Sequence, residues 1–265
     1  MDEQLKLRIY SYLFGLFGTD GSIKRTSDEK HIYELSLELI DKEVLDQIES
    51  LIPNCSRSER NRNTNYKTNY HSYVLRCHNK DFITWCENNG FPIKDKTNTI
   101  KPPVGEYSEA DFWRGIIDGD GSIGLKKAEE QPFLSLTTKS EALKESYDDF
   151  IEKYTGFRPN NSRNMRDDIY NITLHGKKAI KIMSIIYENS FIHIDRKYQN
   201  YLQNKDWQGK KRLGGAARKW TPEEEADLLI MTNKQFALKY PYRSIPAIRG
   251  KRTRLTGSAS DEHLK

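Results

Sequence analysis

The chain contains one stretch of sequence twice: LFGLFGTDGSI at residues 13–23 and WRGIIDGDGSI at residues 113–123. Corresponding residues lie 100 positions apart, and each copy has an apolar run with a glycine inside it, followed by Asp-Gly-Ser-Ile. Self-similarity at the length of a small domain predicts a duplicated structural unit. Each half then contributes one acidic residue, Asp20 or Asp120.

The apolar residues before each aspartate recur at the spacing of one helix face. They are Ile9, Tyr12, Leu13, Leu16 and Phe17 in the first copy, and Phe112, Trp113, Ile116 and Ile117 in the second. Each glycine inside a helix costs about 1 kcal/mol relative to alanine. Four glycines lie within these helices, namely Gly15, Gly18, Gly115 and Gly119. Close packing of the two helices through their glycines would offset this cost and bring Asp20 and Asp120 together. We expect Gly21 and Gly121 to end the helices in the left-handed conformation.

Two carboxylates at adjacent helix ends repel each other and face the negative ends of both helix dipoles, so the pair favours a bound cation. Oxygen ligands with open coordination positions suit Mg²⁺, which also binds substrate phosphates. The carbonyl groups of Thr19 and Gly119 are candidate additional ligands. The alternative is that each Asp-Gly pair only ends a helix before a turn. We favour metal binding because the pair is matched in both copies.

The two stretches resemble the motif of LAGLIDADG homing endonucleases. The residues that match its characteristic positions are Gly15, Asp20 and Gly21, then Gly115, Asp118, Asp120 and Gly121. The first copy departs from the motif at Gly18, where the family usually has an earlier acid that is not the catalytic one. The resemblance implies an α+β fold, a monomer with two αββαββα halves related by a pseudo-twofold axis. The motif helices would form the central interface, and the sheets would straddle DNA.

A lysine late in each half strengthens the duplication. Lys96 lies 76 residues after Asp20, and Lys197 lies 77 residues after Asp120. In proteins that the chain resembles, such a lysine reaches the active site, where it organises solvent and stabilises developing charge. The resemblance therefore implies that both lysines are catalytic, whereas ordinary surface lysines are the alternative.

Two segments rich in arginine and asparagine, residues 56–67 and 158–166, occupy equivalent places in the halves. In a sheet each would present alternate side chains to one face, where Arg and Asn can contact guanine and adenine edges. Solvated hairpins are the alternative. With the basic residues after each motif, the candidate DNA contacts are Lys24, Arg25, Arg57, Arg60, Arg62, Lys67, Lys126, Lys127, Asn160, Arg163 and Arg166.

Hydrophobic periodicity predicts the same element order in both halves. In the first half we expect helices at 5–20, 42–52 (capped by Asp41) and 80–89, and strands at 21–27, 32–40 and 73–77. In the second half we expect strands at 121–127, 133–138 and 170–174, and helices from Ser140 to 154 and at 179–187.

The basic surplus of the chain lies near its C-terminus. The 265 residues carry 43 Lys+Arg and 38 Asp+Glu, a net charge of +5. Residues 206–265 hold 13 and 7 of these, which leaves 30 and 31 for the rest of the chain. This asymmetry favours a nucleic-acid partner, although basic tails also occur as solvated surface.

The C-terminal segment carries a strong helix-start signal. Thr221 is a cap, Pro222 occupies the first helical position and Glu224 closes a capping box. We expect helices at 222–232, 233–239 and 245–255. The Trp-Thr-x-Glu-Glu opening and residues 243–249 are similar to Myb/SANT-type helix-turn-helix modules. The similarity implies a third helix in a major groove, with contacts from Arg243, Arg249, Lys251 and Arg252. A basic helical appendage packed on the core is the alternative.

The expected domains are two halves at 1–105 and 106–207, a basic linker at 208–219, a helix-turn-helix domain at 220–256 and a disordered tail at 257–265. The cysteines, Cys55, Cys77 and Cys86, show no paired spacing, so neither a disulfide framework nor a zinc knuckle is indicated. The sequence has no secretory segment and no long apolar span. We therefore expect a soluble intracellular protein, cytoplasmic in a prokaryote or phage and otherwise organellar.

These observations predict a site-specific homing endonuclease that acts as a monomer on double-stranded DNA. Asp20 and Asp120 would bind Mg²⁺ at the scissile phosphates; Mn²⁺ would substitute, and Ca²⁺ would bind without turnover. By the resemblance, the product is a double-strand break with short 3′ overhangs at a long, nearly asymmetric site. The alternatives are an intron-splicing RNA maturase and a cleavage-inactive DNA-binding regulator on the same scaffold. An HNH nuclease built on His78-Asn79 lacks a partner histidine pattern.

Overall fold

The computed structural model describes residues 2–28, 30–63, 68–126, 130–209 and 219–257. The chain divides into two compact units, Met1–Lys210 and Lys211–Lys265. The first unit is a mixed α+β structure with two antiparallel sheets, and the second is helical. The predicted fold class is therefore confirmed. The predicted DNA contacts Lys67 and Lys127 lie outside the described residues, as do most of the predicted linker and tail.

The first half repeats the predicted order closely. Its elements are α1 (Glu3–Thr19), β1 (Gly21–Arg25), β2 (Ile32–Leu39), α2 (Lys42–Leu51), β3 (Cys55–Arg62), β4 (Tyr70–Cys77), α3 (Lys80–Asn88) and α4 (Lys96–Thr99). The four strands form one antiparallel sheet in the order β1-β2-β4-β3. Leucines 35, 37 and 39 of β2 are buried in the core. Tyr33 of the same strand is exposed and stacks on His78.

The second half has the three strands that its periodicity predicts, one fewer than the αββαββα pattern that the resemblance implies. Its elements are α5 (Glu109–Asp120), β5 (Gly121–Lys126), β6 (Gln131–Thr138), α6 (Glu141–Thr155), β7 (Tyr170–His175), α7 (Gly176–Tyr187) and α8 (Asp195–Asn204). The sheet is β5-β6-β7, and the segment 158–166 makes only an isolated bridge, Asn164 to Ile169. Pro159 cannot donate to a strand ladder. Arg158 is held instead by three carboxylates of α6, those of Glu145, Asp149 and Glu152.

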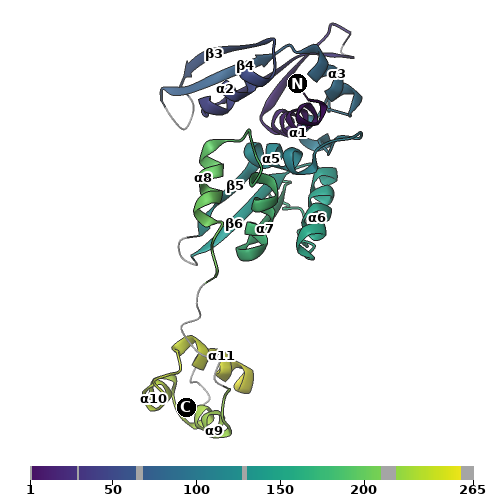
Figure 1. Cartoon of the computed structure of the whole chain (residues 1–265). Coiled ribbons are helices and arrows are strands. Elements are labelled where there is room, and N and C mark those ends of the chain that lie inside the picture. The colour runs from purple at the N-terminus through teal and green to yellow at the C-terminus, as the bar shows by residue number, and fades with distance from the viewer. Residues whose placement is uncertain (1, 29, 64–67, 127–129, 210–218, 258–265) are drawn as a thin grey trace. The chain divides into compact units, whose positions relative to one another are not determined.

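The two motif helices, α1 and α5, pack directly against each other at the centre of this unit (Figure 1). A Cβ added to Gly115 would lie 2.1 Å from the carbonyl oxygen of Tyr12. A Cβ added to Gly15 would lie 2.5 Å from the carbonyl oxygen of Phe112. Only glycine permits this approach, so the predicted glycine-mediated interface is confirmed.

The left-handed conformation predicted for Gly21 and Gly121 is wrong. Neither residue has a positive φ, and each begins a strand, with Gly121 at φ −85° and ψ 162°. An added Cβ would lie 2.4 Å from the Phe17 carbonyl oxygen in the first half and 2.5 Å from that of Ile117 in the second. Glycine is needed here because the chain turns back against its own helix.

Asp41 differs from its predicted role as the cap of α2. Its side chain makes no capping hydrogen bond. Its carboxylate accepts instead from the Arg196 guanidinium of α8, with Nε 3.0 Å from Oδ1. This ion pair links the two halves.

The second unit contains α9 (Pro222–Ile230), α10 (Asn233–Lys239) and α11 (Ile245–Thr256). The capping box of Thr221 and Glu224 is present, with Pro222 in the first turn. Its small core consists of Leu228, Phe236, Tyr240 and Ile248. Among the described helices, none combines the length and the apolar run that crossing a bilayer requires.

Candidate active site and nucleic-acid interface

The two motif aspartates stand at the same end of the central helix pair. Asp20 is the C-cap of α1, and Asp120 is the last residue of α5. The residues just before them touch, since a Cβ added to Gly119 would lie 1.9 Å from Thr19 Oγ1. Both aspartates are exposed to solvent. The structure therefore brings together two solvent-facing carboxylates that the sequence separates by 100 residues.

The surroundings of both carboxyl groups favour their neutral form. Burial by neighbouring atoms raises the pKa of Asp120 to about 6, and the negative charge of Asp20 contributes to this shift. Burial also raises the pKa of Asp20, against the opposing charges of Lys197 and Lys96. Ionising both groups at neutral pH therefore costs free energy that a bound cation would recover.

The two predicted lysines reach the ends of the motif helices. Lys197 of α8 is 4% exposed, and its Nζ donates to the carbonyl groups of Ile117, Asp118, Gly119 and Gly121 at 2.6–3.1 Å. Lys96 of α4 donates to the carbonyl groups of Phe17 at 3.3 Å and Thr19. Burial lowers the pKa of Lys197 to about 8 and also lowers that of Lys96. Both cations complement the negative helix ends.

A pocket of about 240 Å³ opens beside these groups, between the two halves. Lys96 and Asp120, from different halves, both line it, as does Thr19. Lys139, which sequence reasoning missed, lines the same pocket. The alignment of the repeats could have identified it, because Lys139 of the second half replaces Ile40 of the first at the end of the second strand.

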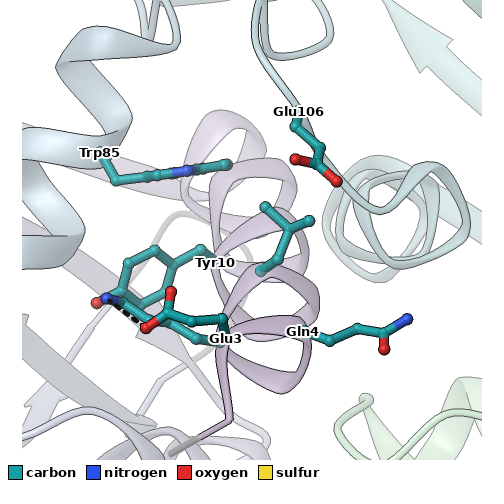
Figure 2. Close-up of a pocket in the computed structure, with 7 residues that line it drawn as sticks. Glu3, Gln4, Tyr10, Trp85 and Glu106 are labelled. Carbon is teal, nitrogen blue, oxygen red and sulfur yellow. Dashed lines mark ion pairs between the residues drawn. The ribbon is translucent and has the colours of Figure 1, made fainter.

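A larger pocket, of about 410 Å³, lies near the N-terminal end of α1 (Figure 2). Its labelled lining residues include Glu3, Tyr10, Trp85 and Glu106. Tyr10 precedes Asp20 by ten residues, which is about 15 Å along a helix. This pocket is therefore separate from the paired carboxylates.

Asp118, the earlier acid of the second motif, is fully buried and holds the fold together. It accepts hydrogen bonds from Tyr12 Oη at 2.8 Å, Tyr187 Oη at 2.5 Å and the backbone N–H of Ile194 at 2.9 Å. Ile194 is the N-cap of α8, the helix that carries Lys197. The first half has Gly18 at this position, where an added Cβ would lie 2.7 Å from Ile100 Cδ1.

The open face of the first sheet carries three of the predicted DNA contacts, each paired with a glutamate. Lys24 lies 2.9 Å from Glu34, and Arg60 and Arg62 lie 3.1 and 2.9 Å from Glu38. Arg25 ends β1 where the register shifts. The glutamates hold these cations over the sheet face without covering them, since Lys24, Arg60 and Arg62 remain about half exposed.

Arg57 does not lie on that open face. Residues alternate along a strand, and Arg57 binds Asp46 and Glu49 of α2. It therefore faces the helix layer. The prediction placed it among the DNA contacts because a polar strand gives no sign of which face its neighbours cover.

In the second half, local acids hold two of the predicted arginines. Arg163 lies 2.9 Å from Asp168 and over the Tyr170 ring, and Arg166 lies 2.7 Å from Asp167. Lys126 is exposed at the end of β5, and Asn160 is exposed in the loop before β7. The open sheet face carries short polar side chains that the sequence prediction missed, namely Ser122, Ser135, Thr137, Asn171 and Thr173.

Three of the four predicted DNA contacts in the second unit make contacts within its fold. Arg252 is fully buried and donates to the Met231 carbonyl group and to Asn233. Arg243 binds Glu224 at 2.8 Å, and Lys251 binds Glu225 at 2.5 Å. Arg249 alone of the four is exposed.

Replacing Asp120 with asparagine should stabilise the metal-free protein at neutral pH. The pKa of Asp120 is raised in the folded state from 3.8 to about 6, so ionisation destabilises the fold. The cost is absent below about pH 3.8, grows as the pH rises and is complete above about pH 6. After allowance for solvent screening we expect a gain of about 1 kcal/mol at pH 7.5 and none at pH 3.5. Thermal unfolding of both proteins in EDTA measures this gain. If the variant and the wild type melted at the same temperature at pH 7.5 as well as at pH 3.5, the raised pKa of Asp120 would be wrong.

Comparisons with known proteins identify the family of the repeated unit. The model of the LAGLIDADG-like domain matches residues 9–90 and 108–184, one match in each half. No curated protein matches the chain. Among solved structures, the homing endonuclease I-WcaI bound to its DNA recognition sequence is 16% identical, covers 72% of this chain and 86% of its own, and has a TM-score of 0.51.

Two further solved structures are more distant. Meganuclease I-SmaMI, bound to uncleavable DNA, is 12% identical over 76% of this chain and 90% of its own, with a TM-score of 0.46. The N-terminal LAGLIDADG domain of DUF199/WhiA is 13% identical over 72% and 87%, with a TM-score of 0.45. The family match covers most of α1, all of α5 and both sheets. The chain therefore belongs to the LAGLIDADG-like domain family and carries two copies of the domain.

Proposed function

We propose that the chain is a site-specific homing endonuclease that makes a metal-dependent double-strand break in DNA. The observation that carries the proposal is the pair of exposed carboxylates, Asp20 and Asp120, at the abutting ends of α1 and α5. A structural role would not require two ionisable groups whose pKa values are both raised. Perturbed pKa values of this kind cluster at functional sites.

The donor set fits a divalent ion such as Mg²⁺, with Mn²⁺ as a substitute. Both donors are carboxylates, and in the described part of the chain no group of three or more Asp, Glu, His or Cys side chains is placed to hold a metal ion. Mg²⁺ is commonly held by one or two carboxylates, with water and substrate phosphate as the other ligands. Bound there, the ion would supply Lewis-acid stabilisation of the phosphate charge and would lower the pKa of a coordinated water.

The lysines keep positive charge beside the phosphate. Lys197 is fixed by four carbonyl groups, so little reorganisation accompanies charge development in the transition state. The carbonyl oxygens of Thr19 and Gly119, candidate metal ligands, already accept from Lys96 and Lys197. A carbonyl has a second lone pair, and this leaves room for a further ligand.

The open sheet faces are the proposed surface for duplex DNA, and one chain supplies both halves, so a monomer suffices. The solved I-WcaI structure, which shares the fold, holds its DNA recognition sequence. By analogy, the exposed cations Lys24, Arg60 and Arg62 would contact DNA from the first sheet, and Lys126 from the second. Phosphate contacts of this kind make binding depend strongly on salt.

Two alternatives keep the same scaffold, an intron RNA maturase and a cleavage-inactive regulator. Retention of both aspartates favours cleavage, since a regulator does not need them. Incubation with a randomised plasmid library and Mg²⁺ separates the three, because only the endonuclease linearises a selected subset of plasmids. Uncut plasmids with tight binding to a duplex, or binding to intron RNA alone, would identify the regulator or the maturase.

We propose that the second unit is a helix-turn-helix module that extends the DNA site. Residues 232–257 include no acidic residue, and all four acidic side chains of the described unit lie on α9. These acids pair with Lys239, Arg243 and Lys251. The exposed cations left on α10 and α11 are Lys234, Arg249 and Arg254.

Replacing Arg249 with alanine should weaken DNA binding without unfolding the module. We expect a loss of about tenfold in affinity and a salt slope smaller by about 1, as for one lost phosphate contact. The matched comparison is Arg252→Ala, which removes a buried guanidinium and should melt the module. Fluorescence anisotropy and circular dichroism measure the two effects. If Arg249→Ala bound DNA with unchanged affinity, the proposal that Arg249 of α11 contacts DNA would be wrong.

A further inference from the structure

We propose that the pocket beside Asp120 is a phosphate-binding site for one DNA strand, and that Lys139 is a catalytic residue there with no equivalent in the other half. This inference rests on the proposed endonuclease function. The pocket, of about 240 Å³, is lined by α1, α4, the end of α5 and the end of β6. It thus adjoins Asp120 where the two halves meet.

The chemistry of the lining suits an anionic oxygen. Lys96 and Lys139 supply two positive charges against the single carboxylate of Asp120, and Thr97 adds a hydroxyl group. A phosphodiester carries one negative charge on two oxygens that accept hydrogen bonds. Charged donors bind such oxygens most strongly.

The backbone around Lys139 is held on both sides. The Arg163 guanidinium donates to the Lys139 carbonyl group at 3.1 Å. Ser140 N–H donates to Thr138 Oγ1 at 3.1 Å, and Ser140 Oγ donates to the buried Ile100 carbonyl group at 2.6 Å. The ammonium group of Lys139 makes no ion pair among the described residues. A fixed backbone with an unpaired ammonium group is preorganised for a ligand.

The two halves differ at this position. Strand registers pair Gly21 with Leu37 and Gly121 with Leu136, so Ile40 corresponds to Lys139. Ile40 is 53% exposed and carries no charge. The next residue, Asp41, is tied to Arg196 rather than to a pocket. At this position, therefore, the second half has a cation and the first half does not.

Because one half has this lysine and the other does not, cleavage of the two DNA strands should depend on Lys139 to different extents. Both strands of a duplex carrying the selected target site are end-labelled separately and cleaved under single-turnover conditions with saturating protein. We expect Lys139→Met to slow cleavage of one strand at least tenfold more than the other, so that nicked duplex accumulates. Lys139→Arg should restore most of the rate. Lys181→Met, which removes an exposed charge from α7 of the same half, should leave both rates unchanged.

A metal-free binding measurement tests the contact independently of cleavage. In EDTA, Lys139→Met should lower affinity for the duplex about tenfold and reduce the salt slope by about 1. A duplex with a neutral methylphosphonate at the scissile position of the affected strand should bind wild type and Lys139→Met equally.

The outcomes separate the two proposals. If wild type cuts both strands while Lys139→Met matches it in both rates and in affinity, the phosphate pocket is wrong and the endonuclease stands. If wild type cuts neither strand but Lys139→Met still loses affinity and salt slope, the endonuclease is wrong and the pocket stands as a DNA contact. Equal slowing of both strands would overturn the strand assignment.

Discussion

The double variant Asp20→Asn, Asp120→Asn should bind target DNA but cleave it at least about 1000-fold more slowly than the wild type. Asparagine keeps the shape of each side chain and removes the negative charge that holds a divalent ion. The loss then includes both the Lewis acid and the activated water, and each of these is worth several kcal/mol of transition-state stabilisation. Linearisation of a plasmid carrying the selected site, followed in Mg²⁺ under single-turnover conditions, measures the rate.

The controls for this prediction exclude unfolding and general charge effects. Because the ionised aspartates destabilise the metal-free fold, the double variant should melt at or above the wild-type temperature. Asp206→Asn removes an exposed carboxylate that follows α8 and should cut at the wild-type rate. A double variant that still cleaves at full speed would place the chemistry elsewhere.

Replacing Gly115 with alanine should destabilise the first unit by about 3 kcal/mol or more. The new methyl group would lie 2.1 Å from the Tyr12 carbonyl oxygen and 2.9 Å from Leu16 N of the facing helix. Neither atom is the end of a flexible side chain, so relief requires the two helices to separate. We expect a melting temperature lower by about 10 °C, together with lost cleavage because the aspartates move apart.

The matched substitution for this prediction is Gly250→Ala in α11, where an added Cβ meets nothing within 4 Å. Helix propensity alone should then stabilise the second unit by up to about 1 kcal/mol. Calorimetry of both variants separates propensity from packing. If Gly115→Ala melted at the wild-type temperature, α1 and α5 would not be in direct contact at Gly115.

The sequence predicted the parts of the structure that depend on local periodicity and on the repeat. The motif helices, their glycine contact and the capping box of Thr221 each leave a signal within a few residues. Conformation at Gly21 and Gly121 was mispredicted because a helix-ending glycine commonly adopts positive φ. Here the strand that follows demands extended backbone instead.

The side-chain partners could not be predicted, because they depend on contacts between distant elements. Arg57 faces α2, and Arg252 is buried under α9 and α10, although both resemble exposed cations in the sequence. The segment 158–166 of the second half contains three arginines, as β3 of the first half does. The acids on α6 that hold Arg158, together with Pro159, distinguish it from a strand.

The central claim is that Asp20 and Asp120 share divalent metal at the foot of the two motif helices. Anomalous diffraction from crystals of the DNA complex grown with Mn²⁺ tests this directly. We predict an anomalous peak between the two side chains, within about 2.2 Å of a carboxylate oxygen from at least one of them. A complex with Mn²⁺ bound only at other residues, or with the two carboxylates on opposite sides of the interface, would contradict the account.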